Sequence, residues 1–100
     1  MGFGSIITIN MHTMDKFKIS GELSFTTVPN INKSGLDFIK RMSSPVFDLS
    51  LVSFSDNSGV ALLISWKRCA KKLNKQITFI NVPKQLMALV TASSLKEILK

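Results

Sequence analysis

Few side chains in this chain of 100 residues could carry out chemistry. There is one histidine, His12, and one cysteine, Cys69, so neither an intramolecular disulfide nor a cysteine-cluster metal site can form. With only six acidic residues a catalytic carboxylate pair is hard to build, and we expect Asp37 and Asp48 at the surface or at strand ends. No Gly-x-x-x-x-Gly-Lys phosphate loop is present. We therefore expect no catalytic residue, no metal site, no cofactor and no enzyme activity.

The stretch with the most informative spacing is Asp56-Asn57-Ser58-Gly59, where β-forming residues give way to an apolar helix pattern. A helix N-terminus exposes backbone N–H groups and carries a partial positive charge. Asp56 and Asn57 are good capping residues for these groups. Ser58 and Gly59 keep the first turn small, so that the backbone of a partner could approach. A capped helix start would explain the same residues, and both interpretations stay open on composition alone.

The helix after this junction has two faces of different character. At about 100° per residue, one face collects residues expected in the core, namely Gly59, Leu62, Leu63, Trp66, Ala70 and Leu73. The opposite face collects Asn57, Val60, Ile64, Lys67, Arg68 and Lys71. Val60 and Ile64 are therefore predicted to be exposed beside Asn57, and exposed apolar residues beside polar caps are what a docking surface needs.

The formal net charge of +7 favours an acidic partner. Lys67 and Arg68 lie on the predicted docking face, where they would help to orient such a partner. Cations near a helix C-terminus also interact favourably with the helix dipole, so both explanations stay open. Nucleic acid is not expected, because Trp66 is predicted inside and no aromatic residues interleave with the basic ones.

The chain also lacks the signals of a membrane or secreted protein. No apolar run comes near the ~18 residues that a membrane span needs. The first residues, MGFGSIITINMH, have no basic leader of the secretory kind. We expect a soluble cytoplasmic protein with Cys69 as an ordinary buried or half-buried residue in a reducing compartment.

The first half of the chain predicts two strands and a helix. Alternating apolar residues indicate strands at Ser5–Met11 and Phe17–Leu23, joined as a hairpin by a turn at Asp15-Lys16. A helix follows over residues 28–42, with Thr27 as its N-cap. Gly35 falls on the apolar face of this helix, where it should allow close approach to a sheet.

The second half predicts two further strands, Val46–Phe54 and Gln76–Val82, on either side of a helix at Gly59–Leu73. A helix from Pro83 and a short last helix at Ser94–Lys100 follow. The order is ββαβαβαα. Because strands joined by a crossover helix normally lie parallel, we expect one α/β domain over residues 1–100. Its small, mixed, mostly parallel sheet should have helices packed against it.

Three segments together resemble a STAS domain. They are GEL at residues 21–23, FDLSLVSFSDNSGVALL at residues 47–63 and AKKLNKQITFINV at residues 70–82. The STAS family includes the anti-sigma-factor antagonists, and within it the likeness is closest to the MlaB-type subunits of bacterial Mla phospholipid-transport ABC complexes. The similarity runs from about Phe17 to Leu99 and is most specific at Asp56–Leu63.

This resemblance implies a non-catalytic accessory subunit that docks on the cytosolic ATPase subunit of an ABC transporter. Residues 56–59 would form the contact, Val60 and Ile64 would be its apolar anchors, and Lys67 and Arg68 would orient the partner. The protein would then be cytoplasmic, and peripheral to the inner membrane only through its partner.

The resemblance also implies an alternative, an anti-sigma-factor antagonist whose partner is a serine kinase. In antagonists the junction is Asp-Ser-Ser-Gly, and phosphorylation of the first Ser adds a charge of roughly −2 and abolishes binding. Asn57 has no hydroxyl at this position, where MlaB-type proteins carry Thr, so we expect a constitutive dock. Ser58 is the remaining candidate phosphosite.

Overall fold

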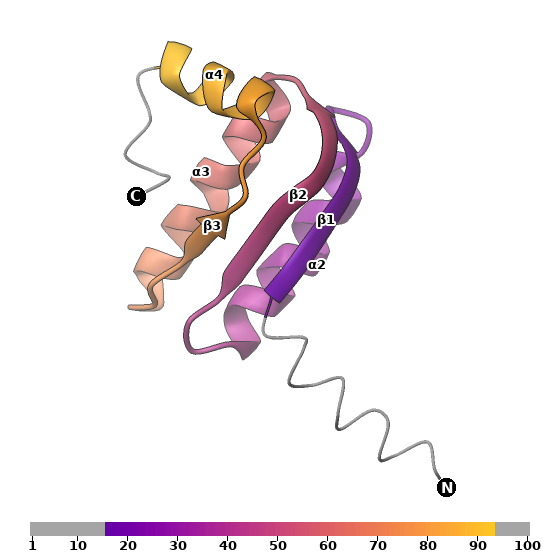
Figure 1. Cartoon of the computed structure of the whole chain (residues 1–100). Coiled ribbons are helices and arrows are strands. Elements are labelled where there is room, and N and C mark those ends of the chain that lie inside the picture. Colours follow the sequence, from indigo (N-terminus) through magenta and orange to yellow (C-terminus); the bar gives the residue numbers. More distant parts are fainter. Residues whose placement is uncertain (1–15, 94–100) are drawn as a thin grey trace, which may run out of the picture.

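The sheet of this protein consists of three parallel strands, in a computed structural model that describes residues 16–93 (Figure 1). The strands β1 (Lys16–Leu23), β2 (Val46–Ser55) and β3 (Thr78–Ile80) lie in that order, so β2 is central. The predicted strand at Gln76–Val82 is longer than β3. The predicted strand at Ser5–Met11, which would have made the sheet mixed, lies outside the described residues.

Two of the helices begin at the same end of the sheet, because each follows one of the parallel strands. Helix α2 (Val28–Arg41) follows β1 and helix α3 (Asn57–Lys72) follows β2, and both lie behind the strands in Figure 1. Helix α4 (Lys84–Ala92) lies at the end of the sheet where β2 runs into α3. The α/β architecture is confirmed, and the predicted helix at 94–100 lies outside the described residues.

An aromatic cluster forms the centre of the core. Phe17, Phe47 and Phe79 are register partners on adjacent strands, with ring centroids 5.3 Å and 5.8 Å apart. The indole of Trp66 stacks on Phe47 at a centroid distance of 4.4 Å, and Trp66 is 0% exposed. Its predicted place in the interior is confirmed. Such rings bury the largest apolar areas of any side chains and hold α3 against the sheet.

Gly35 sets the spacing between α2 and α3. A Cβ atom at this position would overlap the ring of Trp66. The predicted role of Gly35 in close approach is confirmed, but its neighbour is a helix and not the sheet. The indole N–H of Trp66 donates to Asn32 Oδ1 on α2 at 3.0 Å, so the polar edge of this buried ring is satisfied.

The C-terminal ends of α2 and α3 are joined by a lysine. Asn74 follows α3 with a left-handed φ of 57°, which asparagine tolerates better than most residues. The ammonium group of Lys75 then donates to the carbonyl oxygens of Ile39 and Lys40 at 2.8 Å each. Part of the basic charge therefore has a structural role at the end of α2.

Two polar residues differ from their predicted places. Lys16 is the first residue of β1 and not part of a turn. Asp48, expected at the surface or at a strand end, lies within β2 and is only 7% exposed. Asp48 Oδ1 accepts hydrogen bonds from the N–H of Ser50 at 3.0 Å and from Asn81 Nδ2 at 3.2 Å, and these bonds allow its burial.

Candidate functional site

The Asp56 carboxylate joins the two loops at the carboxyl end of the sheet. Asp56 is the N-cap of α3, and its Oδ1 accepts from the N–H of Ser58 at 2.7 Å, as predicted for a capping residue. Its Oδ2 accepts from the N–H of Phe25, in the loop between β1 and α2, at 3.4 Å. The backbone N–H of Asp56 donates to Leu23 O at 3.0 Å. One residue thus fixes the β1–α2 loop beside the start of α3.

Thr27 orders the β1–α2 loop from the other side. Its hydroxyl accepts from the N–H of Ser24 at 2.9 Å and donates to Glu22 O at 2.8 Å. Thr27 occupies the N-cap position of α2 as predicted, but its side chain makes no capping hydrogen bond to that helix. The hydroxyl is used within the turn instead, which closes the loop that carries Phe25.

Phe25 is the apolar residue that this end of the molecule exposes most, with 74% of its surface accessible. Phe54, two residues before Asp56, is 48% exposed. Neither residue is among the exposed apolar side chains that the sequence predicts. A signal was present for Phe25, because an aromatic residue stands among Ser and Thr in a turn directly after the GEL segment. We call the surface formed by Phe25, Asn57 and Ser58 around Asp56 the tip.

Val60 does not belong to the tip, and its predicted exposure is wrong. Its side chain is only 4% exposed and is part of the hydrophobic core. Ile64 is half-buried and packs against that core. Leu73, predicted in the core, is instead 42% exposed. Val60 and Ile64 are covered because the sheet, α2 and α4 all pack against α3, whereas Leu73 lies just beyond the last residue of that helix.

Gly59 has a packing role inside the chain, and its predicted contact with a partner stays a prediction. It is buried, and a Cβ atom there would overlap Ser55 Oγ and lie 3.2 Å from Leu23 Cβ. Ser55 itself is 0% exposed, and its hydroxyl donates to the carbonyl oxygen of Asp56 at 2.9 Å. The small first turn of α3 therefore serves close packing of the chain on itself.

Asn57 and Ser58 are the polar residues of the tip. Asn57 is exposed, and Ser58 is half-buried with its N–H bound by Asp56. Lys67 and Arg68 lie about 15 Å further along α3, at ~1.5 Å per residue from Asn57. They also face different hollows, since Lys67 lines one with Gln76 whereas Arg68 lines the groove between α2 and α3. The structure does not bring these two cations together with the tip.

No other chemistry-bearing cluster emerges within residues 16–93. No group of three or more His, Cys, Asp or Glu side chains there could hold a metal ion. Cys69 is half-buried on α3, as expected, and His12 lies outside the described residues. In the same part of the chain, no helix is long and apolar enough to cross a membrane.

The comparison with protein families decides what kind of domain carries this tip. A family model described as the MlaB-type STAS domain matches residues 12–100. The chain belongs to the STAS domain family. No curated protein sequence matches the chain. STAS domains are in general non-catalytic domains that bind protein partners, and the described part of this one agrees with their α/β architecture.

Solved structures show the same STAS fold. The unphosphorylated form of the anti-sigma factor antagonist SpoIIAA superposes with a TM-score of 0.70 at 20% identity, covering 85% of this chain and 76% of that chain. The phosphorylated form of SpoIIAA, a Bacillus cell fate determinant, gives a TM-score of 0.65 at 20% identity, with coverages of 85% and 78%. At this identity the likeness defines the fold and leaves the partner to be determined.

Proposed function

We propose that this STAS domain is a non-catalytic accessory subunit that docks its tip on the cytosolic ATPase subunit of an Mla-type ABC transporter. In this role it supports phospholipid transport between membranes from the cytoplasmic side. The family match over residues 12–100 supports the transporter assignment. The observation that carries the docking surface is the Asp56 carboxylate, which joins the loop of Phe25 to the start of α3 while the Phe25 side chain stays exposed.

The tip has the physical properties of a prepared contact surface. The loop of Phe25 is closed by hydrogen bonds before any partner arrives, so less conformational entropy is lost on binding. An exposed aromatic side chain is a favoured anchor in protein interfaces. Helix α2 follows β1 through the loop of residues 24–27, and α3 follows β2 after Asp56. The partial positive charges at these two helix starts favour acidic or carbonyl groups on the partner. The side-chain amide of Asn57 can donate or accept a hydrogen bond at the edge of the tip.

The test is co-purification of the full chain with the ATPase subunit encoded by a neighbouring gene. We expect Phe25→Ser to weaken binding about tenfold or more, because an exposed anchor is lost without damage to the core. Leu51→Ser is the matched control, since Leu51 is 58% exposed on β2 and lies outside the tip. Equal binding of the ATPase subunit by Phe25→Ser and wild type would show that the tip is not the contact surface.

The alternative is an anti-sigma-factor antagonist that acts on a serine kinase, which the SpoIIAA-like fold supports. Asn57 argues against a phosphorylation switch, because it is exposed at the start of α3 and has no hydroxyl. Ser58 is half-buried, and Asp56 holds its N–H. Incubation with a neighbouring-gene kinase and ATP, followed by mass measurement, separates the two functions. We expect no phosphate on the wild type, and stoichiometric phosphate on Ser58 would favour the alternative.

A further inference from the structure

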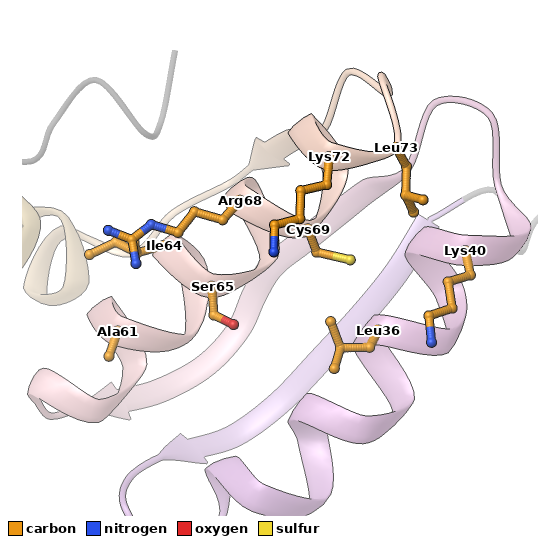
Figure 2. Close-up of a pocket in the computed structure, with 9 residues that line it drawn as sticks. All are labelled: Leu36, Lys40, Ala61, Ile64, Ser65, Arg68, Cys69, Lys72 and Leu73. Carbon is orange, nitrogen blue, oxygen red and sulfur yellow. The ribbon is translucent and has the colours of Figure 1, made fainter.

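A groove of about 650 Å³ runs between α2 and α3, on the side of these helices that faces away from the sheet (Figure 2). Its apolar lining comes from both helices. Leu36 of α2 and the sulfur of Cys69 on α3 extend into the space between the helices. Leu73, just beyond the end of α3, is 42% exposed at one end of the groove, and Ala61 is exposed toward the other. This groove is apolar surface that the described chain leaves uncovered.

Both walls of the groove carry positive charge. Lys40 stands on the α2 wall, and Arg68 and Lys72 stand on the α3 wall (Figure 2). All three residues are exposed, and none of the described residues that line the groove is acidic. An occupant that complements this surface must therefore have an apolar stripe with negative charge on both of its sides.

The groove continues toward the tip. A second hollow, of about 240 Å³, shares Ala61 and Ser65 with the first and extends to Ser58 in the first turn of α3. From Ser58 to Leu73 the two hollows follow α3 for about 22 Å, at ~1.5 Å per residue. A protein that contacts the tip can therefore extend a segment of its own chain along the groove without a break in the contact.

We infer that the groove between α2 and α3 binds an acidic amphipathic helix of the partner protein. A single acyl chain has its charge at one end, whereas the cations here flank the apolar strip from two walls. A helix with Glu or Asp on either side of an apolar stripe matches that arrangement, as in other helix-in-groove contacts. The inference rests on the proposed function in one respect, namely that the partner is the protein bound at the tip.

The direct test uses Cys69 as a reporter, since it is the only cysteine of the chain. The probe is a synthetic peptide of about 18 residues with Leu at helical i, i+3, i+4 spacing and Glu on both flanks. The control peptide has the same Leu stripe with Lys on both flanks. We expect the Glu peptide to slow alkylation of Cys69 in the full chain by N-ethylmaleimide about tenfold at saturation. The Lys peptide should leave the rate unchanged, and equal protection by both peptides would overturn the inference.

Charge reversal on the groove walls makes the test specific. The variant Lys40→Glu, Arg68→Glu, Lys72→Glu should lose protection by the Glu peptide and gain protection by the Lys peptide. All three side chains are exposed, so the fold should be kept.

The matched control makes the same change of net charge outside the groove. In the variant Lys16→Glu, Lys71→Glu, Lys84→Glu, all three positions are exposed and none lines the groove. It should behave as the wild type. Equal loss of protection in both variants would show that only net charge matters and would overturn the inference.

Two further measurements test a different occupant of the groove and distinguish this inference from the proposed function. If phosphatidylglycerol vesicles protect Cys69 and the Glu peptide does not, the groove meets a membrane surface and the inference is wrong. Binding of the ATPase subunit is then compared between Phe25→Ser and the groove-wall variant. Weaker binding by the groove-wall variant alone would support the groove and contradict the tip. Weaker binding by Phe25→Ser alone would support the tip and contradict the groove as a contact for that partner.

Discussion

The side-chain amide of Gln85 pairs with both backbone polar groups of Ser55. The N–H of Ser55 donates to Gln85 Oε1 at 2.8 Å, and Gln85 Nε2 donates to Ser55 O at 2.7 Å. Gln85 lies in the first turn of α4, and Ser55 is the last residue of β2. The amide thus takes the place of a neighbouring strand at the end of β2 and holds the residue that precedes Asp56.

We expect Gln85→Ala to lower the free energy of unfolding by about 1–3 kcal/mol, because it leaves two buried backbone groups without partners. Denaturant unfolding followed by the fluorescence of Trp66, the only tryptophan, measures this change. Lys84→Ala, at the neighbouring exposed position, should change the free energy by less than about 0.5 kcal/mol. A change of that small size in Gln85→Ala would show that water satisfies Ser55 equally well.

Gly59 and Ser55 should be coupled in a double-mutant cycle. Gly59→Ala places a methyl group against Ser55 Oγ, and we expect it to cost about 1–3 kcal/mol of unfolding free energy. Ser55→Ala removes the overlapping oxygen, so Gly59→Ala should cost less in that background, by at least about 0.5 kcal/mol. Additive effects of the two substitutions, measured by thermal and denaturant unfolding, would contradict the close contact.

Gly35→Ala should push α2 away from the indole of Trp66. The new methyl group overlaps the ring, which is stacked on Phe47 and cannot move without loss of that contact. We expect a loss of about 1–3 kcal/mol in unfolding free energy and a red shift of the tryptophan emission maximum. Ser34→Ala, at the preceding exposed helix position, is the control and should leave both unchanged. An unchanged emission maximum in Gly35→Ala would indicate that the helices are not held this closely.

Asp48 should make stability depend on pH in the acid range. The hydrogen bond from the N–H of Ser50 is the main cause that holds the pKa of Asp48 below its ordinary value. The hydroxyl of Ser50, the amide of Asn81 and the charge of Lys18 lower this pKa further, whereas burial raises it. Because the pKa is lower in the folded state, the ionised carboxylate stabilises the fold above about pH 4. This contribution is lost as the pH falls from there through the lower, folded-state pKa.

The measurement is the free energy of unfolding as a function of pH, compared between the wild type and Asp48→Asn. We expect the wild type to be the more stable protein at pH 7, and the difference to shrink as the pH falls below about 4. Asp37→Asn, at an exposed position of α2, should give a difference that changes less with pH. A pH-independent difference for Asp48→Asn would show that its charge does not matter.

Helix α3 shows which features a sequence pattern can predict and which it cannot. Its cap at Asp56 follows from local chemistry, because the cap bonds to residues two and three positions away. The helix itself begins at Asn57, two residues before the predicted start at Gly59. Whether Val60 is exposed depends on how many elements cover the helix. A helical wheel that assumes a single buried face places Val60 on the exposed side, whereas its side chain is buried. The predicted burial of Leu73 is wrong for the opposite reason, since α3 ends before this residue and no element within residues 16–93 buries it there.

The sequence by itself determined the α/β element order over residues 16–93, the junction at Asp56–Gly59 and the STAS resemblance, since these depend on patterns within short stretches of chain. Only the tertiary structure decided that Phe25 stands beside Asp56, that Gln85 holds Ser55 and that cations from two helices flank one groove. These relationships join residues about 30 positions apart or on separate helices. Their distances follow from how the parallel strands and their crossover helices pack, which no local pattern encodes.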